Sequence, residues 1–189
     1  MAQSTTTVRR PATRRRVTFL VTAAALAGFD LSAKAWAQSN LAGNPLEGGP
    51  LDLRLAYNPG VAFSFAAEAP SWIVIAVTAA ITLAVAVYGW RTAATSGRAL
   101  TVAIAAILGG ATANLIDRAG DKVVTDYLHT GWWPTFNLAD VFIVCGGIAV
   151  VILSWRHSEQ DRGCPPGGVA TFPPPTAVHR FHVPVEPRH

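Results

Sequence analysis

Apolar residues in this chain gather into four stretches, each long enough to cross a bilayer. A hydrocarbon core is spanned by about 20 helical residues. The stretches contain 21, 21, 19 and 19 residues, counting both ends, and occupy residues 17–37, 70–90, 99–117 and 137–155. The pattern predicts an all-α membrane protein, a bundle of four transmembrane helices.

The remaining segments flank this bundle. We expect residues 1–16, which are polar and rich in arginine, to form a disordered cytoplasmic N-terminus. Residues 17–155 would be one membrane domain. Residues 156–189 would be a disordered cytoplasmic tail rich in proline. The chain is 51% hydrophobic and only 14% charged, which leaves no room for a separate soluble domain.

Strand-like segments lie in two connections between the apolar stretches. Residues 51–55 alternate leucine with polar residues, which predicts a short strand, and residues 123–127 have a strand-like composition. Residues 57–60 have the composition of a turn, and residues 62–65 would continue as an extended segment. We expect a small extracytoplasmic β-like cap, which could bind an extended peptide through backbone hydrogen bonds.

Basic residues are distributed in the way that sets membrane topology. The connections 38–69 and 118–136 mix basic with acidic residues. The other flanks of the apolar stretches are basic, with Arg9, Arg10, Arg14, Arg15, Arg16, Arg91, Arg98, Arg156 and Arg162. The positive-inside rule predicts that both termini are cytoplasmic. The net charge of +4 is explained by topology, so nucleic acid is not an expected partner.

The N-terminus has an alternative interpretation. Arg14-Arg15-Arg16 before an apolar run resembles a twin-arginine export signal, and Ala35-Trp36-Ala37 resembles a cleavage site. Cleavage would leave three spans and move the C-terminus to the opposite face. We favour an uncleaved first span, because Asp30 and Lys34 interrupt the apolar run.

The two cysteines and the histidines indicate neither a disulfide nor a metal site. Cys145 lies within the fourth stretch, where we expect a small packing residue. Cys164 lies in the tail, too far away to pair with it. No metal-ligand spacing is present in the sequence, so we expect no cofactor.

Ionisable residues gather at one end of the apolar stretches, where such groups are costly and usually kept for function. Asp30 and Lys34 are four residues apart and can pair on one helical face, either as a purely structural ion pair or in support of a site. Asn114 and Asp117, three residues apart, share a face of the third stretch. Small residues before them, at 109–113, predict a close helix contact.

Two further aspartates follow. Asp126 lies in the last connection, and Asp140 opens the fourth stretch, where Asn137 would be the N-cap and Asp140 the N3 residue. Helix capping alone would account for Asp140. Two carboxylates brought together here could instead share a proton and activate water. Tyr127, Trp132 and Trp133 are typical of an interfacial aromatic belt.

Five motifs, in order, resemble those of the signal peptidase II family of lipoprotein signal peptidases. Asp30-Leu31-Ser32-Ala33-Lys34 is similar to the family's Asp-x-x-x-Lys, and Asn58-Pro59-Gly60-Val61-Ala62-Phe63-Ser64 to its Asn-x-Gly-x-Ala-Phe-Ser. Residues 109–118 resemble Gly-Gly-x-x-Gly-Asn-x-x-Asp-Arg. Val124-Thr125-Asp126-Tyr127 and Phe136-Asn137-Leu138-Ala139-Asp140 resemble Val-x-Asp-Phe and Phe-Asn-x-Ala-Asp. The chain departs from the pattern at Ala113, at Val141 and in a short 126–140 connection.

The resemblance implies an aspartic endopeptidase in a bacterial cytoplasmic membrane, with its site at the outer face. It implies Asp126 and Asp140 as the catalytic pair, with Asp117 in a supporting role. The other implied substrate-binding or supporting residues are Asp30, Lys34, Asn58, Gly60, Asn114, Arg118, Asn137 and Ala139. The implied substrates are prolipoproteins, cut before a diacylglyceryl-modified cysteine.

The implied mechanism is water attack by a carboxylate pair that shares one proton. We favour Asp140 as the base, because a helix N-terminus stabilises a carboxylate, although the pair titrates as a unit. Membrane lipids are the expected surroundings, and nothing in the sequence demands more than a monomer. Two alternatives are a proton-coupled transport protein and a non-catalytic membrane scaffold whose aspartates only cap helices.

Overall fold

The computed structural model describes residues 12–60 and 70–162, with side chains described up to residue 156. The elements follow in the order α1 (Ala12–Asn40), β1 (Asp52–Asn58), α2 (Ser71–Thr92), α3 (Arg98–Asp121), β2 (Val124–His129) and α4 (Leu138–Arg162). The predictions for residues 1–11, for residues 62–65 and for the tail beyond residue 162 concern parts of the chain outside the described residues.

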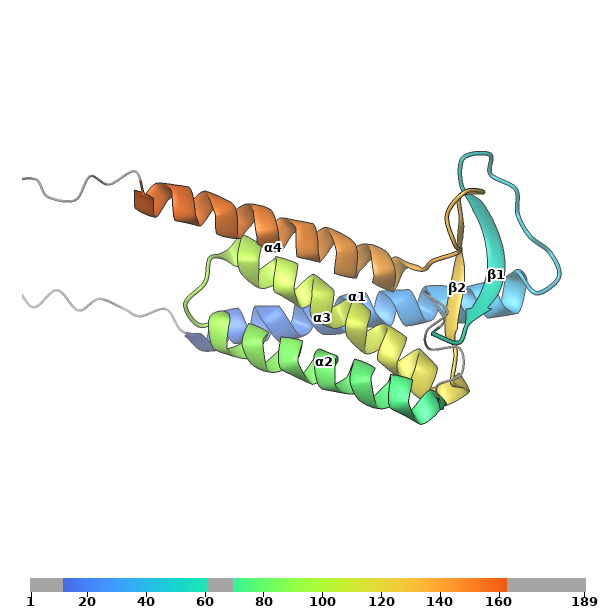
Figure 1. Ribbon diagram of the computed structural model, residues 1–189, viewed down its shortest axis with the longest axis horizontal. Coiled ribbons are helices and arrows are strands. Elements are labelled where there is room, and N and C mark those ends of the chain that lie inside the picture. Colours follow the sequence, from blue (N-terminus) through green and yellow to red (C-terminus); the bar gives the residue numbers. More distant parts are fainter. Residues whose placement is uncertain (1–11, 61–69, 163–189) are drawn as a thin grey trace, which may run out of the picture.

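Each of the four helices is long and apolar enough to cross a membrane. Helix α3 lies between α2 and α4 and also packs along α1 (Figure 1). The start of α1 and the end of α4 lie at one end of the bundle, and the two-stranded sheet covers the other (Figure 1). The predicted fold, four transmembrane helices with a small β cap, is confirmed.

Glycines allow α3 to approach its neighbours closely. A Cβ at Gly109 would lie 2.7 Å from the Ala23 carbonyl oxygen of α1, and one at Gly110 would overlap the Ala139 carbonyl of α4. A Cβ at Gly146 of α4 would lie 2.7 Å from the Ala103 carbonyl oxygen of α3. The small residues therefore bring three helix backbones together, as the sequence predicts.

Two helices extend beyond the predicted apolar stretches. Helix α1 begins at Ala12, so residues 12–16 are helical and not part of a disordered terminus. Helix α4 continues to Arg162, although a disordered tail was expected from residue 156. Hydropathy marks only the apolar part of a span. Adding turns to an existing helix is cheap, and arginine stems can reach from it to the interface.

The cap is an antiparallel pair of strands. Asp52 lies opposite His129 and Asn58 opposite Val124, with an irregularity between Leu53 and Ala56. Strand β1 thus runs three residues further than the predicted 51–55. Its Leu53 and Leu55 pack on a buried cluster of Ala37, Leu41 and Tyr127, which fastens the sheet to the end of α1.

The chain after β2 turns back on itself before α4. The Phe136 carbonyl accepts hydrogen bonds from the backbone N–H groups of Tyr127 and Leu128, at 3.0 and 2.8 Å. The Phe136 N–H donates to the Leu128 carbonyl at 3.0 Å. This turn returns the chain to β2, so that α4 begins beside Asp126.

Two side-chain predictions in this region are wrong. Tyr127 is not part of an aromatic belt: it is 4% exposed, because the pleat of β2 points it into the cap cluster. Trp132 and Trp133 are exposed, as a belt requires. Cys145 is exposed as well, not a packing residue, because it lies on the outer face of α4.

Candidate active site

Lys34 is the centre of a buried polar cluster beneath the cap. Its ammonium lies 3.0 Å from Asp30 Oδ2 and 3.2 Å from Asp117 Oδ2, and it donates to Asn114 Oδ1 at 2.6 Å. An ammonium has three protons, and these three contacts account for them. The predicted pairing of Asp30 with Lys34 is confirmed, and the pair joins α1 to α3.

Asp30 also connects α1 to the start of α4. Its Oδ1 accepts the backbone N–H of Ala139 at 2.9 Å, and both residues are fully buried. The Leu138 N–H donates to the Tyr127 hydroxyl at 3.4 Å. These N–H groups belong to the first turn of α4, where a helix has no internal acceptors for them. The carboxylate and the hydroxyl therefore fix the position of the helix that carries Asp140.

The N-cap prediction for α4 is confirmed. The Asp140 N–H donates to Asn137 Oδ1 at 3.0 Å, and the Asn137 N–H donates to Asp140 Oδ2 at 3.3 Å. Asp140 has a second partner, because Asn114 Nδ2 donates to its Oδ1 at 2.8 Å. Asp140 therefore does more than cap: both its oxygens accept N–H bonds, and one is linked through Asn114 to Lys34.

Asn137 contacts both aspartates of the pair implied by the sequence. Its side-chain amide donates to Asp126 Oδ1 at 2.6 Å, while its oxygen and backbone N–H bind Asp140. Asn137 is 0% exposed and Asp126 2% exposed, whereas Asp140 is only partly buried. The turn after β2 thus brings Asp126 and Asp140 to opposite ends of one asparagine side chain.

Burial raises the pKa of Asp126 to about 6. The hydrogen bond from Asn137 opposes this shift, the neighbouring Asp140 adds to it, and Asn58 and Lys34 oppose it. A carboxyl group that keeps its proton to such a pH can act as an acid near neutrality. Asn58, at the end of β1, thereby takes the position near the carboxylates that the sequence predicts.

Asp117 has a separate role from these two aspartates. It accepts the Thr125 N–H at 2.7 Å and lies 3.4 Å from the Thr125 hydroxyl, in addition to its ion pair with Lys34. Gln38 donates to the same hydroxyl at 2.8 Å. Asp117 thus holds β2 against α1 and α3. Sequence reasoning missed Thr125 and Gln38 as supporting residues. Thr125 is next to Asp126 in the predicted strand, and this position could have suggested a supporting role for it.

Arg118 does not bind its neighbour Asp117 but points to the turn after β1. Its guanidinium would lie 3.7 Å from a Cβ at Gly60, whose φ of +97° is one that glycine adopts readily. Its Nε is buried, and within the part of the chain that the structure describes it has no hydrogen-bond partner. The Gly60 N–H donates to Asn58 Oδ1 at 2.9 Å, which shapes the turn.

An apolar groove of about 370 Å³ opens beside Asp140. Its lining combines aromatic residues of the turn after β2 with residues along α4: Thr130, Trp132, Trp133, Phe136, Asp140, Val141, Val144 and Cys145. The groove explains two features that the sequence left unexplained, the exposure of Cys145 and the apolar Val141 next to Asp140. A partly buried carboxylate therefore lies at the edge of an apolar surface that continues along a membrane-spanning helix.

The arrangement defines a class of protein, a helical membrane bundle with two carboxyl groups joined by one asparagine at one end. Residues 22–156 match the family described as Signal peptidase (SPase) II, so the chain belongs to that family of proteases. The lipoprotein signal peptidase of Syntrophomonas wolfei is 39% identical over 137 residues, covering 70% of this chain and 89% of the relative. That of Rhodococcus jostii is 37% identical over 157 residues, covering 78% and 77%.

Solved structures agree with this assignment. A bacterial membrane enzyme determined by the in meso method at 2.3 Å resolution superposes with a TM-score of 0.68 at 25% identity, covering 78% of this chain and 93% of the other. A second, at 1.9 Å resolution, gives a TM-score of 0.65 at 26% identity, covering 72% and 92%. The family resemblance seen in the five motifs is thereby confirmed.

Proposed function

We propose that this protein is an aspartic endopeptidase that removes the signal peptide from bacterial prolipoproteins, cutting before a diacylglyceryl-modified cysteine. The observation that carries the proposal is the bridge formed by Asn137 between Asp126 and Asp140. One asparagine that orients two carboxylates from different elements is more than capping requires. The relatives that share this chain's motifs are lipoprotein signal peptidases.

The surroundings divide the roles within the pair. Asp140 is only partly buried, lies at the N-terminus of α4, and accepts hydrogen bonds from Asn114 and from the Asn137 backbone, a setting suited to a base. Asp126 is more deeply buried, and its raised pKa of about 6 favours the protonated form. Asp140 is then the base and Asp126 the acid, within a pair that shares one proton.

Hydrolysis then follows from these positions. Asp140 takes a proton from water, and the resulting hydroxide attacks the scissile carbonyl carbon. The protonated Asp126 donates a hydrogen bond to the carbonyl oxygen and stabilises the tetrahedral intermediate. When that intermediate collapses, the C–N bond breaks and the leaving amine takes the proton that Asp140 had accepted. Lys34 forms ion pairs with both Asp30 and Asp117, offsetting part of their negative charge, and takes no part in proton transfer.

The substrate and topology fit the same site. The lipid-modified cysteine would keep the scissile bond at the depth of the pair, and the groove along α4 offers apolar surface for the substrate. The basic end of the bundle would be cytoplasmic, with the cap outside. Signal-like cleavage after Ala37 would remove Asp30 and Lys34 from the cluster, so we propose that α1 stays uncleaved. The site would be complete in one monomer, without a metal.

The test is cleavage of a diacylglyceryl-modified prolipoprotein by the purified protein in detergent. We expect Asp126→Asn and Asp140→Asn each to lower the cleavage rate by about 10²–10⁴-fold, the usual contribution of a positioned acid or base. Asp121→Asn, at an exposed position at the end of α3, is the matched control and should cleave normally. Thermal melts establish that each variant is folded.

Each alternative predicts a different result. If Asp117→Asn is folded but inactive and Asp126→Asn remains active, the pair is misassigned. If the folded wild-type protein releases no signal peptide, the proposed function fails and a scaffold or transport role replaces it. Proton flux in liposomes that Asp140→Asn abolishes would favour the transport role.

A further inference from the structure

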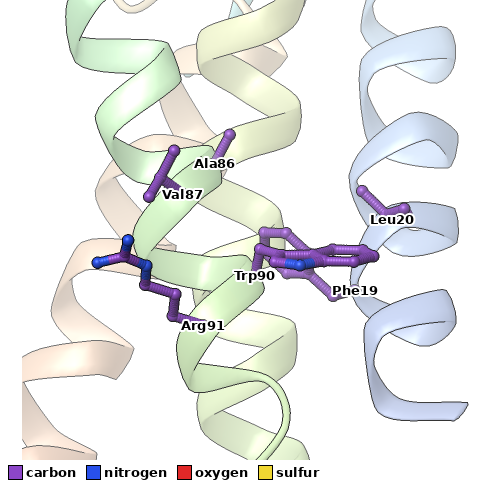
Figure 2. A pocket seen from close by; sticks show the side chains of 6 residues that line it. All are labelled: Phe19, Leu20, Ala86, Val87, Trp90 and Arg91. Atoms are coloured by element: carbon purple, nitrogen blue, oxygen red, sulfur yellow. The ribbon is translucent and has the colours of Figure 1, made fainter. Parts of the chain in front are cut away.

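The end of the bundle opposite the cap contains a second apolar groove, between α1 and α2. Its volume is about 390 Å³, within the range of small-ligand sites. It is lined by Phe19, Leu20, Ala86, Val87, Trp90 and Arg91. Figure 2 shows the Trp90 ring reaching from α2 towards Phe19 and Leu20 on α1. The groove faces outward on the part of the molecule that lipid surrounds, about three turns from the polar cluster.

Phe19 forms the closed side of this groove. It is 1% exposed, and a Cβ at Gly89 would overlap its ring, so Phe19 fills the space where α2 lacks a side chain. Leu20 and Val87, in contrast, are 47% and 43% exposed. The groove is therefore closed at Phe19 and open to the surroundings at Leu20 and Val87.

The charge around this groove has one sign. Residues 12–29 and 70–116 contain no aspartate or glutamate. They contain five arginines, all at this end of the bundle: Arg14, Arg15, Arg16, Arg91 and Arg98. A protein surface with this charge pattern attracts anionic lipid headgroups, at about 1 kcal/mol for each basic residue near the surface.

Two of these arginines are held in place by α2 and the turn after it. Arg16 stacks over the Trp90 ring, with its guanidinium carbon 4.8 Å from the centroid, and its Nε donates to the Trp90 carbonyl at 3.3 Å. Arg15 donates to the Ser96 carbonyl at 2.8 Å. The carbonyl contacts are neutral acceptors, so among the side chains that the structure describes neither guanidinium has an acidic partner.

We propose that this groove binds one anionic phospholipid from the leaflet at the basic end of the bundle. One acyl chain lies in the slot beside Leu20 and Trp90, and the phosphate accepts hydrogen bonds from Arg16. Arg91 lines the slot with its stem, and its guanidinium extends to the other side of α2, where it adds positive charge at the flank (Figure 2). The proposal does not depend on the proposed peptidase activity.

Native mass spectrometry of the purified protein tests this site. The protein is incubated in detergent with equal amounts of phosphatidylglycerol or phosphatidylcholine of the same acyl chains. We expect phosphatidylglycerol to be retained at least about fivefold more, and Arg16→Gln to lower its retention about fivefold, as the loss of one phosphate contact implies. Arg156→Gln, an exposed arginine on α4, is the charge-matched control and should retain the lipid.

A second pair of variants tests the slot itself. Leu20→Trp fills the groove and should abolish retention, whereas Val151→Trp, at a 62% exposed position on α4, should not change it. Both positions are exposed, and thermal melts check that the variants fold. Equal retention of the two lipids, an equal loss in Arg156→Gln, or full retention in Leu20→Trp would each overturn the proposal. The proposal would also be overturned if the spectra showed a dimer and no lipid adducts, and if Leu20→Trp dissociated that dimer. A second copy of the chain would then fill the groove.

Discussion

The two ends of the bundle use charge in opposite ways. Beneath the cap, Lys34 is 2% exposed and Asp30 is 0% exposed, and each is paired or hydrogen-bonded. At the other end, Arg15 and Arg16 lie near the surface, and the contacts they make with described residues are to backbone carbonyls and one ring. The first arrangement excludes water and gives each buried charge a partner. The second leaves charge available to the membrane surface.

The difference shows at which end of the bundle the loss of one charged side chain should strongly affect stability. A buried ion loses its hydration, so removing one partner leaves an uncompensated charge. An exposed arginine keeps its water and can be lost at small cost to stability. The capped end should therefore respond strongly to single substitutions, and the basic end weakly.

The largest effect on stability should come from Lys34→Met. This change leaves Asp30 and Asp117 without their shared cation and should lower the free energy of unfolding by about 3–5 kcal/mol. Arg98→Met, at an exposed position at the basic end, should change it by less than about 0.5 kcal/mol. Denaturant unfolding in detergent measures both. Equal effects of the two substitutions would remove the contrast between the ends.

Gly110→Ala should have the next largest effect, at the contact between α3 and α4. The added Cβ would overlap the Ala139 carbonyl and lie 2.9 Å from Ile143 Cγ1, so the helices must separate. We expect a loss of about 1–3 kcal/mol in the free energy of unfolding, together with slower cleavage, because Asp140 moves with α4. Gly147→Ala is the matched control, since nothing lies within 4 Å of its Cβ. A fully stable and active Gly110→Ala protein would contradict this account of the packing.

The pH dependence of cleavage should show a smaller effect, centred on Asp126. Its pKa is raised to about 6, so its protonated form is lost, and kcat/KM should fall, as the pH rises through that value. Asn137→Ser removes the amide that stabilises the carboxylate while keeping an N-cap oxygen. The pKa should then rise further, and the falling limb should move to higher pH by up to about 1 unit.

A control variant makes the pH test specific. Gln38→Ala loses a contact to the Thr125 hydroxyl and touches neither Asp126 nor Asp140. The falling limb of its pH profile should therefore stay at the wild-type pH. A shift of the Asn137→Ser limb to lower pH would reverse the assigned effect of this hydrogen bond. It would also argue against Asp126 as the proton donor.

Features set by local sequence could be predicted, and features set by tertiary contacts could not. The Asp30–Lys34 pair and the Asn137 cap depend on spacing within one helix, and both were correct. The inward position of Tyr127 depends on the pleat and docking of β2, and the outward position of Cys145 on the packing of α4. The polar cluster around Lys34 depends on how α1 packs against α3, so the sequence suggested its members but not which of them are in contact.

The hydrogen bond from Ala139 to Asp30 also has a consequence for biosynthesis. It joins residues 109 positions apart, on the first and last helices. While the chain is still emerging from the ribosome, Asp30 has no α4 to bind and the carboxylate pair lacks one member. With Asp126 and Asp140 as the proposed catalytic pair, activity would begin only after α4 has been inserted and has met Asp30. Insertion of the last helix would therefore also complete the proposed pair.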